Sequence, residues 1–361
     1  MITVSVPGSL LLLGEYCILE QGMKGLSLGV APKLFLTAEP ASRWTIIAQG
    51  AGDPVCFSIV NIMEGKIPLI QHCQQQENRG AAWATPHIFQ TVLSKFIECE
   101  HKNPLLTSEP YTITIDSSSF YYNGKKLGLG SSAGVVVVWS AFLFLLAYNG
   151  SLSKERLLDF CISVHKIIQQ GRGSGYDVLT SILGNLLFFS MSEYHSVRQY
   201  PLRSFDAEII CALHEVKTPA AIDAYEAYKK KHPVQARIFC QKTQSILHRA
   251  IYILNEAESC GTTAISIVQE TKEYKKLLKL FKKAGKLSEN LGNMIGVPAV
   301  FPVPSSCIIK CLGAGNEMAL AEPIGFDFKT NNSTGVESDL SEAEVYKFSC
   351  VPSTGIQWEF T

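Results

Sequence analysis

The run GLGSSAG combines small residues with two hydroxyl groups and is the clearest candidate for chemistry in this sequence. Glycines let the backbone turn tightly, so that successive N–H groups can face one point. The apolar stretch from Ser131 onward predicts a helix whose free amides and positive dipole end would lie there. The side chains of Ser131 and Ser132 could reach a phosphate oxygen or a Mg2+ ion bound to it. The residues expected to form this phosphate-binding loop are Gly128, Leu129, Gly130, Ser131, Ser132, Ala133 and Gly134.

The same run also fits a weaker interpretation, a glycine-serine turn that only packs a helix. It contains neither the GK[ST] of a Walker loop nor the GxGxxG of a dinucleotide site. A second glycine-rich segment, GRGSGYD at Gly171–Asp177, follows a predicted helix over Ser153–Gln170 that has Ser153 as its N-cap. Both glycine-rich loops are therefore expected next to helices.

The sequence around these loops predicts a first half that begins with several strands and continues with helices. Pro7 and Gly8 are expected to break one short strand from a second, and Asn123–Gly124 marks a turn just before the first loop. Alternation and β-branched residues predict strands at Ile2–Val6, Leu10–Leu13, Ala31–Glu39, Trp44–Ala48 and Tyr111–Asp116. Apolar residues at helical spacing predict a helix over Ala82–Glu100.

The residue composition changes after Ser190, where a polar stretch leads into a strand-like segment, Ala207–Leu213. We expect two domains, residues 1–195 and 196–361, because 361 residues exceed what one hydrophobic core usually serves. The second half predicts strands at Ala207 and near Cys307 and helices over Thr218–His232, Pro233–Glu258 and Thr262–Gly285.

Composition argues against several classes of partner. Lys plus Arg equals Asp plus Glu at 32 each, so no net field would hold the chain on nucleic acid or an anionic membrane. The lysine-rich segment within Thr262–Gly285 fits a solvated helix face better than a binding patch. The apolar run Val135–Ala147 is shorter than the roughly 20 residues of a bilayer span, and we expect a buried helix there.

Cysteine usage favours a reducing compartment. The 11 cysteines are dispersed through apolar runs without a CxxC pair, which suits buried thiols better than a disulfide framework or a zinc site. The N-terminal segment has no basic region before its short apolar run, so we expect no secretory signal. These features together predict a cytoplasmic protein.

Three segments resemble the motifs of one enzyme family when they are read together. Pro7–Tyr16 (PGSLLLLGEY), Gly128–Gly134 and Lys310–Leu320 (KCLGAGNEMAL) resemble, in this order, the three motifs of the GHMP kinases. That family includes galactokinase, homoserine kinase, mevalonate kinase and phosphomevalonate kinase. Gly171–Val178 and Val216–Ala220 resemble most closely the corresponding segments of phosphomevalonate kinases.

The resemblance implies a fold of the α+β class with two domains. The first would be like a ribosomal protein and the second of ferredoxin-like type.

The resemblance also implies that ATP lies across the Gly128–Gly134 loop, with Mg2+ near Ser131 and Ser132. Within this scheme Asp177 matches the catalytic aspartate, although it could also be a cap or turn carboxylate after two glycines. We also expect Lys166 to act in catalysis. The positions expected to contact the substrate are Ser9, Glu15, His165, Arg172, Ser174, Gly175, Lys217, Gly313, Ala314 and Gly315. Of these, Glu15 fits an ordering role in its turn better than a chemical one.

The sequence departs from the family pattern at three places. Ser9 stands where many relatives carry a catalytic lysine. Lys166, eleven residues before Asp177, stands where mevalonate kinases place a Mg2+-binding glutamate. Asn316 and Glu317 replace a glycine-rich tail. A phosphate acceptor tolerates the first two changes, because its second pKa of about 6 makes it a dianion at pH 7. Such an acceptor needs cations to hold it, and we expect these to be His165, Lys166, Arg172 and Lys217.

These arguments predict an ATP-dependent kinase that phosphorylates 5-phosphomevalonate, as a monomer or homodimer with a small-molecule acceptor as its partner. One alternative is mevalonate kinase or another GHMP kinase. Another is a GHMP-fold binding protein that has lost catalysis and senses a metabolite or nucleotide.

Overall fold

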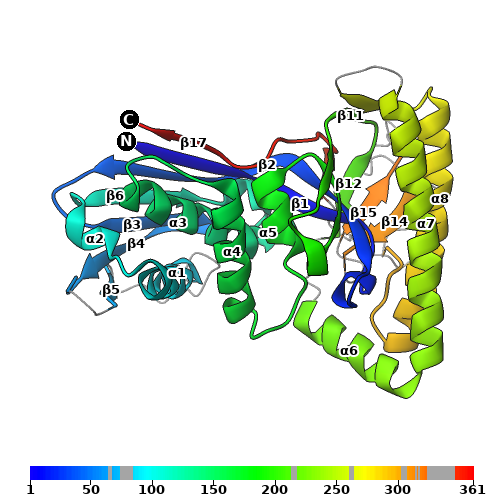
Figure 1. The fold of residues 1–361 in the computed structure, drawn as a ribbon, viewed down its shortest axis with the longest axis horizontal. Coiled ribbons are helices and arrows are strands. Elements are labelled where there is room, and N and C mark those ends of the chain that lie inside the picture. Colours follow the sequence, from blue (N-terminus) through cyan, green and yellow to red (C-terminus); the bar gives the residue numbers. More distant parts are fainter. Residues whose placement is uncertain are drawn as a thin grey trace, which may run out of the picture. The chain divides into compact units, whose positions relative to one another are not determined.

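The chain forms two compact units. The computed structural model describes residues 1–63, 67–73, 84–212, 218–259, 264–301, 307–313, 315, 318–322 and 346–361. The first unit comprises Met1–Pro201 together with Pro352–Thr361, and the second comprises Leu202–Val351. The expected domains, 1–195 and 196–361, place the boundary slightly earlier and assign the last ten residues to the second domain. The last ten residues return to the first unit, where their strand pairs with the N-terminal strand, so the two termini lie side by side (Figure 1).

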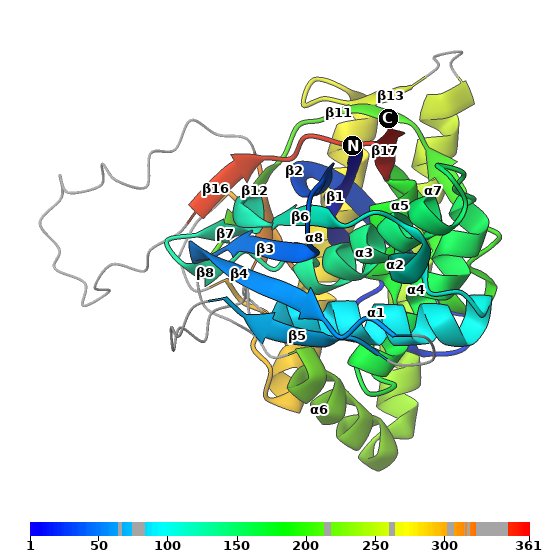
Figure 2. The same ribbon diagram turned by 90° about the vertical axis from the view of Figure 1, so that its left-hand side faces the viewer.

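A nine-stranded sheet forms the frame of the first unit. Its strands are β1 (Ile2–Leu13), β2 (Lys24–Pro40), β3 (Thr45–Gly50), β4 (Gly52–Val60), β5 (Leu69–His72), β6 (Tyr111–Asp116), β9 (Leu186–Ser190), β10 (Arg198–Tyr200) and β17 (Gln357–Phe360). One side of β2 pairs with β1, and its other side pairs first with β9 and then with β6. Strands β3, β4 and β5 continue outward from β6, and β5 forms the outer edge (Figure 2).

Strand β1 is continuous, so the expected break at Pro7–Gly8 is wrong. The register of β1 against β2 shifts between Pro7 and Gly8, which marks a bulge rather than an end. A proline cannot donate to the ladder and is tolerated at such irregularities. Nearly every residue of β1 is buried. The free energy of burying these side chains along a continuous strand therefore outweighs the free energy lost at the bulge.

The helices of the first unit pack on this sheet and on one another. They are α1 (Ala84–Glu100), α2 (Pro104–Thr107), α3 (Ser131–Ala147), α4 (Lys154–Ile168) and α5 (Tyr176–Leu183). Helices α3 and α5 contact β1 and β2, whereas α1 and α4 contact α3. Helix α3 is therefore surrounded, and this explains why it is apolar on all faces. In the described part of the chain, no helix combines the length and apolar character needed to cross a bilayer.

Short elements connect these helices and strands. They are the 3-10 turns η1 (Cys17–Leu19), η3 (Ser118–Phe120) and η4 (Met191–Glu193) and the hairpin strands β7 (Tyr121–Tyr122) and β8 (Lys125–Lys126). The β7–β8 hairpin turns at Asn123–Gly124, as the sequence predicts, and leads directly into the Gly128–Gly134 loop.

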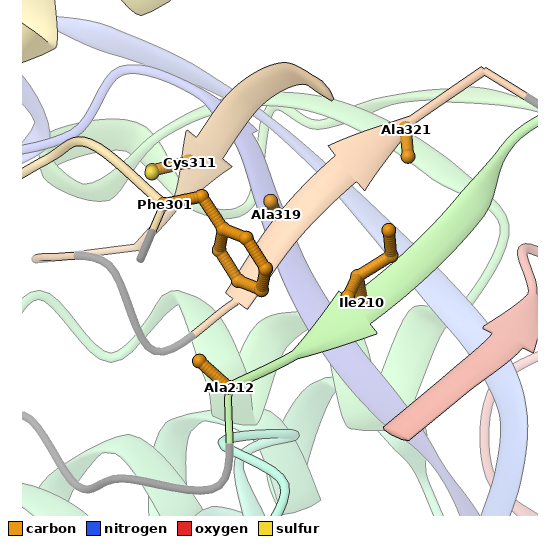
Figure 3. Packing of buried hydrophobic residues seen from close by; sticks show 6 residues of the cluster. All are labelled: Ile210, Ala212, Phe301, Cys311, Ala319 and Ala321. Atoms are coloured by element: carbon orange, nitrogen blue, oxygen red, sulfur yellow. The ribbon is translucent and has the colours of Figure 1, made fainter. Parts of the chain in front are cut away.

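The second unit combines a small antiparallel sheet with long helices. Its elements are β11 (Leu202–Phe205), β12 (Glu208–Cys211), α6 (Thr218–Lys231), α7 (Pro233–Ser259), β13 (Ile265–Ile267), α8 (Lys272–Ile295), β14 (Ile308–Leu312), β15 (Met318–Ala321) and β16 (Tyr346–Ser349). Four strands form the sheet, in the order β14-β15-β12-β16. Figure 3 shows a buried cluster on this sheet, made of Ile210, Ala212, Phe301, Cys311, Ala319 and Ala321.

Helix α8 differs from its predicted range, Thr262–Gly285. A strand, β13, comes first, and the helix begins at Lys272 behind the Thr271 cap and continues to Ile295. Gly285 does not end the helix; it allows close packing, because a Cβ there would lie 2.9 Å from the Cβ of Lys310 on β14. The lysines of α8 are mostly exposed while Leu277, Leu280 and Phe281 are buried, as expected for a helix with a solvated face.

Gly355 joins the C-terminal segment to α5 at very close range. A Cβ at Gly355 would overlap the carbonyl oxygen of Ile182, and a Cβ at Gly184 would overlap the backbone of Gly355. We expect Gly355→Ala to lower the free energy of unfolding by at least about 2 kcal/mol, because two backbones must separate. Urea denaturation measures this. Gly22→Ala, where a Cβ meets nothing within 4 Å but a φ of 74° strains alanine, is the control for backbone strain alone, and a loss at Gly355 no larger than at Gly22 would contradict the packing argument.

Candidate active site

The Gly128–Gly134 run leads into α3 as the sequence predicts, and it leaves the start of that helix without a side-chain cap. Gly128 and Gly130 have φ angles of 72° and 75°, in the left-handed region, and Gly130 is the N-cap of α3. Because glycine offers no capping oxygen, no side chain of the N-cap satisfies the first amides of α3. Ser131 is buried and Ser132 is partly exposed. This arrangement suits an anion at the helix start.

Ser9 links this loop to the second glycine-rich segment. It is fully buried on β1, and its backbone N–H donates to the carbonyl oxygen of Leu129 at 3.0 Å. Its hydroxyl donates to Oδ1 of Asp177 at 2.6 Å. A Cβ at Gly130 would overlap the Ser9 hydroxyl and lie 3.1 Å from Oδ1 of Asp177. The second half of β1, the loop before α3 and the start of α5 therefore meet at one point.

Asp177 lies in the first turn of α5, behind the N-cap Gly175. Burial raises the pKa of its carboxyl group. The hydrogen bond from Ser9 and the nearby His165, Tyr176 and Lys126 act in the opposite direction without cancelling the effect of burial. The N-cap Gly175 has no side chain to cap α5, and the positive end of this helix also faces this region. The carboxylate is thus held by hydrogen bonding and has a high affinity for a proton.

The two expected cations on α4 differ in their surroundings. Lys166 is exposed, whereas the neighbouring His165 is buried and within electrostatic reach of Asp177. Burial lowers the pKa of His165, although the Asp177 carboxylate raises it, so the neutral ring is favoured at pH 7. Its Nε2 lies 3.1 Å from Nε2 of Gln169. The spacing of eleven residues indicated Lys166, but it is His165 that lies on the Asp177 side of the helix.

Lys126 is a cation near the candidate site that the sequence reasoning missed. It lies on β8, two residues before Gly128, and its charge lowers the pKa of the Asp177 carboxyl group. Its side chain is exposed, as is that of the neighbouring Lys125. The signal that could have found it was a lysine pair between an Asn-Gly turn and a glycine loop, a position that a hairpin brings back to the loop.

The remaining expected residues are more dispersed. Glu15 is buried in the turn after β1. The pKa of the neighbouring Tyr16 is raised mainly by the burial of the tyrosine and secondly by the charge of Glu15. Arg172 is exposed in the loop before α5, and the Ser174 hydroxyl accepts a hydrogen bond from the Tyr176 amide at 3.4 Å. Gly313 and Gly315 belong to the second unit. Lys217, Ala314, Asn316 and Glu317 lie outside the described residues.

The site's charges limit what it can bind. A phosphate at the start of α3 would lie beside the Asp177 carboxylate, so the two anions would repel unless a cation lay between them. Among the described residues, no group of three or more His, Cys, Asp and Glu side chains could hold a metal ion alone. Mg2+ suits such a place, because it usually takes one or two carboxylates and completes its shell with substrate phosphates and water. The residues present therefore fit a nucleotide bound with Mg2+.

Comparisons with known proteins agree with this geometry. Residues 88–185 match the family model of the GHMP kinases N terminal domain, and no curated protein sequence matches the chain. Three similar solved structures illustrate the likeness. A Lin0012 protein from Listeria innocua has a TM-score of 0.68 at 16% identity, with 99% of each chain covered. Streptococcus pneumoniae phosphomevalonate kinase, in complex with phosphomevalonate and AMPPNP, has a TM-score of 0.59 at 16% identity, with 90% of this chain and 93% of that chain covered. Methanococcus jannaschii mevalonate kinase has a TM-score of 0.57 at 15% identity, with 89% of each chain covered.

The chain has the GHMP kinase fold, and the α+β class expected from the sequence is confirmed. At these identities the likeness concerns the fold, and activity has to be argued from the site itself.

Proposed function

We propose that this protein is an ATP-dependent small-molecule kinase whose acceptor is a phosphomonoester, 5-phosphomevalonate. The reaction would give 5-diphosphomevalonate and ADP. The observation that carries the proposal is the hydrogen bond between Ser9 and Asp177 at the uncapped start of α3. The fold is shared with a phosphomevalonate kinase bound to phosphomevalonate and AMPPNP and, about equally, with a mevalonate kinase, so the choice of acceptor rests on the residues of the site.

The chain's own residues would act mainly by positioning and by neutralising charge. The amides at the start of α3 would hold the nucleotide phosphates, with Ser131 and Ser132 as the nearby hydroxyls. Asp177 would hold Mg2+, which draws charge from the transferring phosphoryl group. The Ser9 hydroxyl would fix the carboxylate in place. An oxygen of the acceptor phosphate then bonds to the γ-phosphorus, and ADP leaves with the electrons of the broken bond.

The change from lysine to serine at position 9 favours an acceptor that is already charged. An alcohol has a pKa far above neutrality, so it needs a base and a cation to become a nucleophile. A phosphate acceptor arrives as a dianion and requires chiefly cations to overcome its repulsion from ATP. Lys126 is one such cation close to Asp177, and Arg172 is another in the loop before α5.

The test is ADP release by the purified protein with Mg2+ and ATP over four acceptors: mevalonate, phosphomevalonate, galactose and homoserine. We expect the highest kcat/KM with phosphomevalonate. Faster turnover of mevalonate would assign the protein as a mevalonate kinase instead. ATP binding without turnover of any acceptor would favour the catalytically silent binding protein and overturn the proposal.

Replacement of Lys126 is expected to weaken the kinase. In this proposal Lys126 would make one charge-assisted contact with a bound phosphate, and loss of such a contact costs about 1.5–3 kcal/mol, so we expect Lys126→Ala to lower kcat/KM about 10- to 100-fold. Lys125→Ala is the matched control, because successive residues of a strand point to opposite faces. Steady-state kinetics of both variants distinguish the two lysines. Equal losses would mean that only the net charge of the hairpin matters.

A further inference from the structure

Two cysteines face each other across the outermost strand pair of the first unit. Cys56 lies on β4, and Cys73 directly follows β5, the edge strand visible in Figure 2. The Cys73 amide donates to the Cys56 carbonyl oxygen at 3.0 Å, which continues the register in which Phe57 opposes His72. Their Sγ atoms are 3.2 Å apart, and the Ser58 hydroxyl lies 3.3 Å from Sγ of Cys73.

This geometry is close to that of a disulfide. Directly opposed residues of antiparallel strands have Cα atoms about 4.5–5.5 Å apart. That spacing falls within the range of about 4.4–6.8 Å that a disulfide spans. The sulfur atoms would have to approach by roughly 1 Å to reach bonding distance, a movement that side-chain rotation supplies. The backbone pairing can therefore stay as it is.

We propose that Cys56 and Cys73 form a site of reversible oxidation, at which a low-molecular-weight disulfide converts the two thiols into a cross-strand disulfide. This inference concerns the sheet edge and does not depend on the kinase activity. Two other features set this pair apart from the remaining cysteines. Cys73 is exposed and therefore accessible to a reagent, and its partner is already in contact with it.

The reaction proceeds in two exchanges. The Cys73 thiolate attacks the small disulfide, so a mixed disulfide forms on Cys73 and one small thiol leaves. The Cys56 thiolate then attacks Sγ of Cys73, the protein disulfide forms, and the second small thiol leaves. The protein gives up two electrons and two protons, and these end on the two small thiols. Burial and the neighbouring Cys73 thiol raise the pKa of Cys56 to about 11, so Cys56 suits the second, intramolecular step better than the first.

The other described cysteines lack this combination. Cys99 on α1 is exposed, so it is accessible to the same reagent. Buried cysteines are Cys17, Cys161, Cys211, Cys240, Cys307, Cys311 and Cys350. Cys99 therefore serves as an internal reference for reactivity without a resolving thiol. Cys260 lies outside the described residues. In peptide mapping, the peptide that contains Cys260 shows its modification separately from that of the other cysteines.

The disulfide would stabilise the pairing of β5 with β4 at the edge of the sheet. Among the described residues, β5 pairs only with β4, and unpaired strand edges open more readily than central strands. A covalent link beside the backbone hydrogen bond from Cys73 to Cys56 would hold β5 against β4. Hydrogen exchange at the β5 amides should therefore become slower in the oxidised protein, whereas exchange at β6 should be unchanged.

The test treats the full chain with oxidised glutathione and maps its peptides by mass spectrometry without reduction. In the unmodified sequence we expect a linked pair of peptides containing Cys56 and Cys73, lighter by two hydrogen atoms and released by dithiothreitol. Cys56→Ser should instead retain one glutathionyl group on Cys73, because the resolving thiol is missing. Cys99→Ser is the control and should still form the link.

Two results would overturn the inference. One is glutathionylation of Cys73 in the unmodified sequence, to the same extent as Cys99, without the linked peptides. The other is a Cys73 that stays unmodified under conditions that glutathionylate Cys99. Unchanged exchange at the β5 amides of the linked protein would contradict only the expected stabilisation of the sheet edge. Circular dichroism of Cys56→Ser and Cys99→Ser verifies that both variants keep the fold of the unmodified protein.

Discussion

Asp177→Asn is expected to lower kcat by at least about 100-fold and, at neutral pH, to make the protein more stable. Activity falls because an amide is a poor replacement for the carboxylate as a ligand for Mg2+, although its oxygen can still accept the hydrogen bond from the Ser9 hydroxyl. Stability rises because burial, the largest influence on the Asp177 pKa, penalises the charged form, and asparagine carries no charge. The site would thus trade stability for function.

The pH dependence of this stability has a definite sign. The folded-state pKa of Asp177 is raised above the unfolded value of about 3.9. The stability linked to this proton is therefore fully present below the unfolded pKa, and it is lost as pH rises through the folded pKa. Asp177→Asn should match the unmodified protein at low pH and exceed it increasingly toward pH 7. Thermal unfolding from pH 3.5 to 7.5 measures the difference.

A control variant and the Mg2+ dependence of the rate test the predicted role of Asp177 further. Asp53→Asn, which replaces an exposed carboxylate on β4, should leave kcat unchanged. If Asp177 holds Mg2+, the variant should need more Mg2+ for its residual activity. A larger loss with unchanged Mg2+ and ATP binding, together with a new dependence of the residual rate on pH, would instead identify Asp177 as a general base.

Gly130→Ala is expected to abolish measurable ATP binding. The new Cβ would overlap the Ser9 hydroxyl and press on the Asp177 carboxylate, at the point where the amides of α3 meet the candidate site. Because catalysis tolerates displacements of only about 0.5 Å, we expect kcat/KM to fall about 100-fold or more. Isothermal titration with AMPPNP and Mg2+, followed by kinetics, measures both effects.

Gly124→Ala is a closely matched control for this change. Both glycines have a φ of 75°, so alanine suffers similar backbone strain at either position, but a Cβ at Gly124 meets nothing within 4 Å. The difference between the variants therefore isolates the collision with Ser9 and Asp177 from the strain itself. Comparable loss of binding in both would show that the loop conformation, rather than the collision, governs ATP affinity.

Local patterns predicted individual elements well where a single signal decided them. Strand β6 spans Tyr111–Asp116 as expected from alternation, and α4 begins behind Ser153, whose hydroxyl accepts from the Arg156 amide at 3.3 Å. The prediction was wrong where tertiary packing overrode the signal. The break expected at Pro7–Gly8 is absorbed by a bulge, and Gly285 in α8 fits against Lys310. Strand β17 has only four residues and no distinctive pattern, so only its pairing with β1 defines it.

The candidate site was predicted in its parts but not in its connections. The glycine loop and Asp177 could be identified from residue types and from the family resemblance. The hydrogen bond from Ser9 to Asp177 joins residues 168 positions apart, and no local pattern encodes such a contact. The roles of His165 and Lys126 likewise depend on which way a helix face and a hairpin point, which the spacing of residues alone did not determine.

The discontinuous first unit has a consequence for how the chain folds during synthesis. Residues 352–361 are made last, yet Gly355 contacts the end of α5, and β17 completes the pairing of β1. While the 150 residues of the second unit leave the ribosome, the outer edge of β1 has no partner from its own unit. An exposed strand edge attracts other chains. Nascent protein stalled before Pro352 should therefore be the form that chaperones retain and that aggregates first.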